Sequence, residues 1–198
     1  HQFGAVLKEG LYDAVEHRAD IFKVCRFYST HDDGRLTALA DYVSRMKDGQ
    51  EEIYYLSGEN LDTLKNSPQL EGFKSRGLEV LFFTDTVDDF WLQMVEEFDG
   101  KKFKSVTKGS IDLSKFEDTK SENGENGKEE KPEAPDLAKL IEAFQTELKD
   151  EVATVRISDR LTDSPVCLVA ADGAVDMKME RVLKIHQKYD PGAAKRIL

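Results

Sequence analysis

Three carboxylates stand close together near the middle of the chain. Asp85, Asp88 and Asp89 could hold a divalent cation, because Mg²⁺ prefers hard oxygen ligands. The same acids precede an apolar helical pattern, and Thr86 and Asp89 match the hydroxyl and acid of a capping box. Carboxylates at a helix start also interact favourably with the helix dipole. The spacing therefore favours helix capping over a metal site.

Other residues that could do chemistry are scattered. The four histidines are never paired at metal-ligand spacing; they are His1, His17, His31 and His186. Cys25 and Cys167 are too far apart in sequence to indicate a redox pair or a zinc site. The sequence contains no phosphate-binding loop and none of the common hydrolase or metalloprotease motifs. We therefore predict no catalytic residue, no metal ligand and no cofactor site in this chain, and two reduced thiols.

The charge balance limits the partners. The chain has 198 residues, and 28 Lys and Arg against 39 Asp and Glu give a net charge of −11. This balance opposes binding to nucleic acid or to an anionic membrane, because both interactions depend on basic side chains. No apolar run approaches the roughly 18 residues of a membrane span, and no signal-peptide pattern opens the sequence. We expect a cytoplasmic protein that binds neither nucleic acid nor membrane.

An acidic segment divides the chain. Residues 117–135 contain seven acids, three lysines and a single hydrophobic residue, a composition typical of disorder. We predict a first domain at 1–110, a disordered acidic linker at 111–135 and a second domain at 136–198. A unit as small as the second buries only about 60% of its unfolded surface. We therefore expect this unit to be stabilised by packing against a partner or against further residues of a longer chain.

The first domain is predicted to be a βαβαβ unit behind a helical lead-in. Apolar residues with helical spacing, Ile21 to Tyr28, indicate a helix over 13–29. Two runs rich in aromatic and branched residues, 52–56 and 80–84, indicate buried parallel strands on either side of a helix. That helix has Ser67 and Pro68 as its cap and first residue and Gly77 as its stop. The remaining predicted elements are a short helix near 39–46, a helix over 86–98 and a strand over 101–107.

The second domain is predicted to be an αββα unit. Its elements are a helix that starts after Asp136, two antiparallel strands at 152–157 and 166–170, and a last helix over 174–187. The fold class is thus α/β (α+β), with two small domains.

Two of these helices carry wide apolar faces. In the helix over 86–98 the apolar stripe covers roughly 140°. The core needs its middle, around Trp91, so Phe90 is expected at an exposed edge. The last helix carries Val175, Met179, Val182 and Leu183 on one side and has Met177 and Ile185 outside this stripe. Flexible Met suits surfaces that fit several partners. Ordinary core packing is the alternative for both helices.

Eight short sequence motifs of this chain occur in the same order in one known family. They are 41–47 (DYVSRMK), 50–55 (QEEIYY), 67–68 (SP), 77–81 (GLEVL), 97–101 (EFDGK), 105–108 (SVTK), 160–165 (RLTDSP) and 179–181 (MER). By these motifs the chain resembles the heat shock protein 90 family of ATP-driven chaperones, and its short connections resemble the bacterial HtpG branch. The resemblance covers nearly all of the chain except the acidic linker.

The resemblance implies a fragment of a longer chaperone. Residues 1–110 correspond to the last part of the family's middle domain, and residues 136–198 to the first part of its C-terminal dimerisation domain. The family's ATP pocket and the Arg that reaches the γ-phosphate then lie upstream of Phe3, so ATP and Mg²⁺ belong to the full-length parent. The parent is expected to be a homodimer, with most of the dimer interface after Leu198. This chain itself is expected not to be an enzyme.

The resemblance also implies where unfolded or partly folded client proteins bind. In bacterial members an amphipathic helix of the middle domain and an apolar helix of the C-terminal domain contact clients. By position, the client-binding residues here are Asp89, Phe90, Trp91, Met94, Val175, Met179, Val182 and Leu183. We expect the chain to hold clients without chemistry of its own.

Two alternatives to client binding remain open from the sequence. A small ligand could bind at the carboxyl ends of the parallel strands, near Ser57, Gly58 and Asp85, where such sheets usually place ligands. The chain could also be a passive spacer between an ATPase and a dimer interface, in which case Phe90, Trp91 and Met179 would all be buried.

Overall fold

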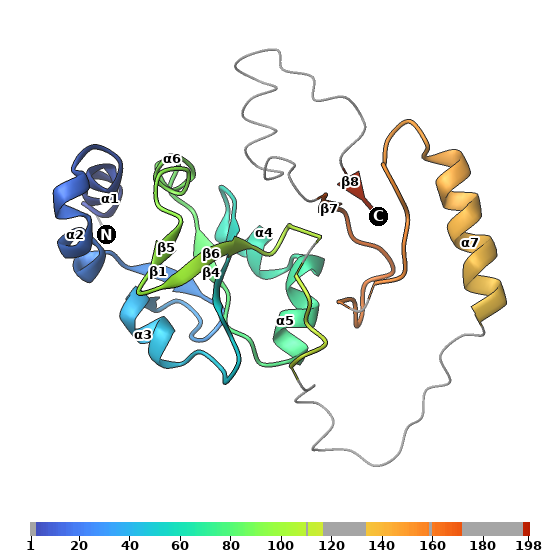
Figure 1. Ribbon diagram of the computed structural model, residues 1–198, viewed down its shortest axis with the longest axis horizontal. Coiled ribbons are helices and arrows are strands. Elements are labelled where there is room, and N and C mark those ends of the chain that lie inside the picture. Colours follow the sequence, from blue (N-terminus) through green and yellow to red (C-terminus); the bar gives the residue numbers. More distant parts are fainter. Residues whose placement is uncertain (1–2, 110, 117–133, 159, 172–195) are drawn as a thin grey trace.

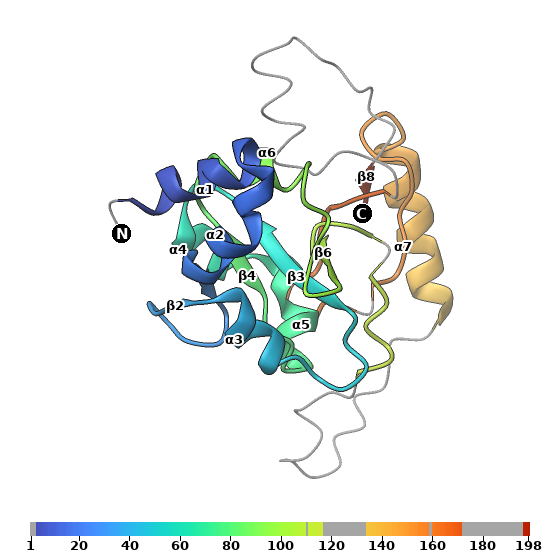
Figure 2. The same cartoon turned by 60° about the vertical axis from the view of Figure 1, so that its left-hand side comes forward.

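A six-stranded sheet with helices on both faces forms the main body of the molecule (Figures 1 and 2). The computed structural model describes residues 3–109, 111–116, 134–158, 160–171 and 196–198. The helices are α1 (Gly4–Asp13), η1 (Val15–His17), α2 (Arg18–Val24), α3 (Leu39–Ser44), α4 (Leu61–Lys65), η2 (Pro68–Leu70), α5 (Glu71–Ser75), α6 (Asp88–Trp91) and α7 (Ala134–Glu147). The strands are β1 (Phe27–Ser29), β2 (Leu36–Thr37), β3 (Glu52–Ser57), β4 (Leu81–Phe83), β5 (Glu97–Phe98), β6 (Lys101–Ser105), β7 (Val169–Ala170) and β8 (Arg196–Ile197).

The strand order of this sheet is β2-β1-β4-β3-β6-β5. β3 pairs in parallel with β4 on one side and with β6 on the other, while the outer strands β1, β2 and β5 pair antiparallel with their neighbours. The α/β fold class and the parallel pairing of the two aromatic runs are confirmed. The predicted βαβαβ unit is the centre of the sheet, and the sequence analysis missed the three outer strands.

Side chains alternate along β3 between two hydrophobic cores, as the pleat of a strand requires. Tyr54 and Leu56 face the core beneath α4 and α5, and Ile53 faces the core beneath α1, α2, α3 and α6. Ser67 accepts a hydrogen bond from the backbone NH of Gln69 at 3.3 Å, and Gly77 has φ +60° after α5. The predicted cap and stop of the helix between the parallel strands are therefore confirmed.

The predicted helix over 13–29 is wrong at both ends. A helix already covers Gly4–Asp13, and α2 stops at Val24, so that Tyr28 lies in a strand. Cys25 is extended with ψ 143°, which ends the helix. The apolar spacing misled because Cys25 and Phe27 are buried by strand alternation, whereas Val24, predicted to be in the helical stripe, is exposed.

The predicted helix over 86–98 is also too long. α6 ends at Trp91, turns follow, and Glu97–Phe98 pairs with β6 as strand β5. Asp99 (φ 51°) and Gly100 (φ 71°) make the tight turn of this hairpin, for which an Asp-Gly pair is well suited. The N-cap residue of α6 is Val87, which makes no side-chain cap hydrogen bond, so Thr86 is not the cap residue that the sequence predicted. The strand after the turn ends at Ser105 rather than at residue 107.

The second domain matches its prediction only in part. α7 is present, but residues 152–157 do not pair with 166–170; Ala153 NH instead donates to the carbonyl of Arg196 at 2.8 Å, and β7 pairs with β8. Short connection length misled here, because a more distant segment supplies the partner. The last predicted helix, 174–187, lies outside the described residues. Ile111, Leu113 and Phe116, placed in the linker above, are buried in the core beneath α5.

Candidate functional site

Trp91 anchors α6 to the sheet. Its side chain is 0% exposed, and its indole makes edge-to-face contacts with Phe22, Phe83 and Phe103 at centroid distances of 5.6, 5.4 and 5.4 Å. The indole NH donates to Asp88 Oδ1 at 2.9 Å. An aromatic side chain of this size, enclosed and hydrogen-bonded, fixes the rotation of a short helix about its axis.

The carboxylate of Asp88 is a buried hub between α1 and α6. Lys8 Nζ donates to Asp88 Oδ2 at 3.1 Å and to Asp85 Oδ2 at 2.8 Å, and the backbone NH of Asp85 donates to Asp88 Oδ2 at 3.2 Å. Burial raises the pKa of Asp88, and the charge of Lys8 opposes that rise. Two of the three carboxylates considered above for a cation therefore have Lys8 as their counter-charge.

The opposite side of α6 and the turn after it face solvent. Phe90 is 50% exposed and Met94 is 53% exposed, while Leu92, Val95 and Asp89 are partly buried. The sequence-based expectation that Phe90 is the ring at the exposed edge is confirmed. We call Phe90 and Met94 the α6 apolar surface.

The predicted client-binding residues fall into three groups. Asp89, Phe90 and Met94 lie together at α6 with access to solvent, and Trp91 is buried next to them, so the structure does not place it on that surface. The reason is the aromatic contacts of its indole, which hold it in the core. Val175, Met179, Val182 and Leu183 lie outside the described residues.

A second exposed apolar region was missed by the sequence analysis. Phe3, Leu7, Val24 and Leu36 line a groove of about 420 Å³ between α1, α2 and the β1–β2 edge. The signal was available, because Phe3, Val6 and Leu7 have the i, i+3, i+4 spacing of one helical face.

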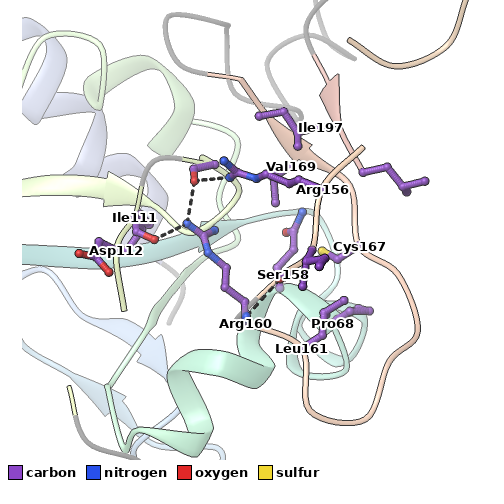
Figure 3. Close-up of a pocket in the computed structure, with 14 residues that line it drawn as sticks. Pro68, Ile111, Asp112, Arg156, Ser158, Arg160, Leu161, Cys167, Val169 and Ile197 are labelled. Atoms are coloured by element: carbon purple, nitrogen blue, oxygen red, sulfur yellow. Dashed lines mark hydrogen bonds between the residues drawn. The ribbon is translucent and has the colours of Figure 1, made fainter. Parts of the chain in front are cut away.

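A cavity of about 350 Å³ lies between the sheet domain and the second domain (Figure 3). Arg156 and Arg160 line it together with apolar side chains such as Leu161 and Val169. Both arginines donate to the carbonyl of Gly109, at 2.7 and 3.2 Å. Ser57, Gly58 and Asp85, the positions of the alternative small-ligand site, do not line this cavity.

Within the described part of the chain, no group of three or more His, Cys, Asp or Glu side chains could hold a metal ion. Within the same residues, no helix is long and apolar enough to cross a membrane.

Glu71, at the start of α5, binds a loop of the second domain. Its Oε2 accepts hydrogen bonds from the backbone NH groups of Thr162, Asp163 and Ser164 at 2.9, 3.0 and 3.1 Å, and Oε1 accepts from the Ser164 hydroxyl. Burial alone would raise the pKa of Glu71, but these four donors together lower it to about 2.

We expect this contact to weaken in acid. A carboxyl whose pKa is lower in the folded state contributes stability that is present above its ordinary value of 4.5 and is lost as pH falls toward 2. Hydrogen exchange of the amides of Thr162, Asp163 and Ser164, corrected for intrinsic rate, measures the loss. Protection should exceed that of a Glu71→Gln variant at pH 6 and approach it near pH 2.5. An equal gap at both pH values would contradict the assignment.

Comparison with known proteins identifies the chain. The family model described as Hsp90 protein matches residues 1–197. The chain therefore belongs to the heat shock protein 90 family.

Its relatives include bacterial chaperones named HtpG. The chaperone protein HtpG of Paramagnetospirillum magneticum is 50% identical over 196 residues, which are 99% of this chain and 31% of that protein. The HtpG of Wolbachia pipientis is 50% identical over 184 residues, covering 92% of this chain and 28% of that protein. The chain thus spans about a third of the length of these relatives.

Among solved structures, the middle domain of a Plasmodium falciparum heat shock protein matches 52% of this chain and 44% of that chain. The sequence identity is 37% and the TM-score is 0.49.

Proposed function

We propose that this chain is the client-holding part of an HtpG-type chaperone, and that the α6 apolar surface contacts unfolded or partly folded proteins. The observation that carries the proposal is the pair of half-exposed apolar side chains, Phe90 on α6 and Met94 in the turn after it, next to a helix whose other side is fixed by Trp91. Exposed apolar side chains that are gathered on a rigid support are typical of binding sites. Asp89 precedes Phe90 on α6 and is partly buried, and we include it in the proposed contact with clients.

The rest of the proposed function concerns the parent protein. We propose that ATP and Mg²⁺ bind outside this chain, that the chain does not hydrolyse ATP, and that the parent acts as a cytoplasmic homodimer whose cleft presents Val175, Met179, Val182 and Leu183 to the same client. Two weak sites held in one assembly bind more strongly than either alone. Titration of this chain with ATP and Mg²⁺ tests the first part, since micromolar binding would contradict it.

The α6 surface is tested in the full-length parent. Replacing Phe90 and Met94 with Ser should lower the retention of a chemically unfolded client about tenfold, because both side chains lose their apolar contacts with it. The stability of the chaperone should change little, since both side chains are already half exposed. A pull-down of fluorescent client measures retention.

A matched control uses other exposed apolar side chains. Tyr12 and Val15, at and just after the end of α1, are 46% and 65% exposed, so replacing both with Ser removes two exposed apolar side chains outside the proposed site. Retention should remain at the parental level. Equal losses in the two variants would indicate unspecific adhesion, and unchanged retention in the α6 variant would reject the site.

A passive spacer is a second candidate for this chain. A spacer is expected to have the side chains of Phe90, Trp91 and Met179 all buried. Phe90 is half exposed, and Met179 lies outside the described residues. The exposure of Phe90 favours client binding over the spacer.

A further inference from the structure

Residues 160–170 of the second domain lie along η2, α5 and the chain that follows β6 (Figure 3). Ala170 NH donates to the carbonyl of Thr107 at 2.8 Å, and Gly109 NH donates to the carbonyl of Ala170 at 2.9 Å. Gln69 Nε2 donates to the carbonyl of Leu168 at 2.8 Å. The two domains are therefore joined by directional polar contacts along a defined surface, which we call the junction.

Arg160 reaches from the second domain into the first. Its side chain is buried, and its guanidinium donates to the carbonyls of Lys108 and Ile111 at 2.8 and 2.7 Å, in addition to Gly109. A planar group with five donors matches such a curved row of carbonyls, whereas a Lys ammonium cannot span it. The orientation of the loop around Arg160 is therefore set by the backbone after β6.

Glu71 provides the opposite contact, from the first domain to the second. Its carboxylate accepts the three loop amides and the Ser164 hydroxyl described above. The junction thus has one charged side chain from each domain, and each binds backbone groups of the other. Charge-assisted bonds of this kind are stronger and more directional than neutral ones.

Gly72 sets how closely the two domains approach. A Cβ added there would lie 2.8 Å from the Cα and 2.8 Å from the carbonyl oxygen of Arg160. Both atoms belong to the backbone, so neither can move away as a flexible side-chain end would. The loop therefore fits against α5 only because residue 72 lacks a side chain.

The hydrophobic core next to the junction is built from the sheet domain. Among the described residues, every buried residue of the core beneath α4 and α5 lies between Tyr54 and Phe116. Apolar burial is the main source of stability in a domain, whereas exchange of protein hydrogen bonds for water contributes little net free energy. The junction can therefore open while the sheet domain stays folded.

We infer that Glu71, Gly72 and Arg160 form a separable lock that fixes the angle between the two domains, and that the second domain detaches from a folded sheet domain when the lock is broken. Opening would also open the 350 Å³ cavity, whose lining comes from both sides of the junction. The inference does not depend on client binding, since it concerns only contacts within the chain.

Gly72→Ala tests the lock because it should stabilise α5 but destabilise the junction. Within α5 the substitution favours helix, but at the junction its methyl group collides with the Arg160 backbone. We therefore expect hydrogen exchange, measured on the whole chain, to become about tenfold faster at the amides of Gly109, Ala170 and Thr162 to Ser164. A tenfold change corresponds to about 1.4 kcal/mol in the free energy of opening. Amides of β3 and β4 should keep their protection.

The control and a second variant keep the test decisive. Gly4→Ala places the same methyl group where nothing lies within 4 Å, and should leave junction exchange unchanged. Glu71→Gln should open the junction without any added bulk, and serves if Gly72→Ala does not fold. Unchanged junction protection in Glu71→Gln would overturn the inference. So would equal acceleration in the junction and in β3 and β4, because the two domains would then unfold as one unit.

Discussion

Replacing Lys8 with Met should destabilise the sheet domain by about 3–5 kcal/mol, because it leaves the buried carboxylate of Asp88 without its counter-charge. Lys8 is itself buried and bridges Asp88 and Asp85 at 3.1 and 2.8 Å. Lys8 Nζ also lies 4.4 Å from the centroid of the Phe27 ring. The Met side chain keeps most of the apolar length of Lys8, so the expected loss is electrostatic. Urea unfolding followed by the fluorescence of Trp91 measures the change.

Two further variants separate charge from packing. Lys23 pairs with Asp20 at 2.7 Å at an exposed position, so Lys23→Met should change stability little. Adding Asp88→Asn to Lys8→Met should recover part of the loss, since a neutral amide can be buried at a lower cost than a carboxylate. A Lys8→Met variant as stable as Lys23→Met would contradict a buried ion pair.

The central part of the fold could be predicted because its signals are local. The aromatic runs around Tyr54 and Phe82 are apolar on both faces, which is typical of strands buried on both sides, and both proved to be central. Ser67, Pro68 and Gly77 mark a helix by their own backbone preferences. The exposure of Phe90 followed in the same way, from its place at the edge of a helical stripe.

The errors arise where a distant partner decides the structure. Residues 94–98 continue the apolar pattern of α6, yet Glu97 and Phe98 pair with Lys102 and Lys101 across a turn. A hairpin competes with a helix there, and sheet pairing is worth more than helical propensity. Residues 152–157 likewise pair with a segment about 40 residues later, around Ile197.

The junction could not be derived from side-chain patterns at all. Arg160 and Glu71 each bind backbone groups, and a backbone carbonyl or NH is present at every residue whatever its type. Neither apolar periodicity nor charge pairing therefore points to these contacts. The motif 160–165 (RLTDSP) is notable in the sequence only because it resembles a family motif. In the structure, Arg160 and the backbone of Thr162 to Ser164 form the contacts of the junction.

Trp91→Ala should destabilise the sheet domain by about 3–5 kcal/mol, the usual loss for truncating a buried aromatic side chain. The indole fills the space between Phe22, Phe83 and Phe103, and its NH binds the buried carboxylate of Asp88. Phe90→Ala, at the next position, should cost less than about 1 kcal/mol, because half of that ring is already in water. Urea unfolding followed by far-UV circular dichroism measures both.

Client retention should separate these neighbours in the opposite way. At a temperature where both variants are folded, Phe90→Ala should weaken retention by the full-length chaperone, since it removes a side chain that meets the client directly. Trp91→Phe keeps an aromatic ring in the core but loses the bond to Asp88, so it should lower stability while leaving Phe90 and Met94 in place to hold the client. A loss of retention in Trp91→Phe equal to that in Phe90→Ala, with the fold intact, would mean that the client reaches the buried ring. The α6 apolar surface would then have to include Trp91, as the resemblance to the family first implied.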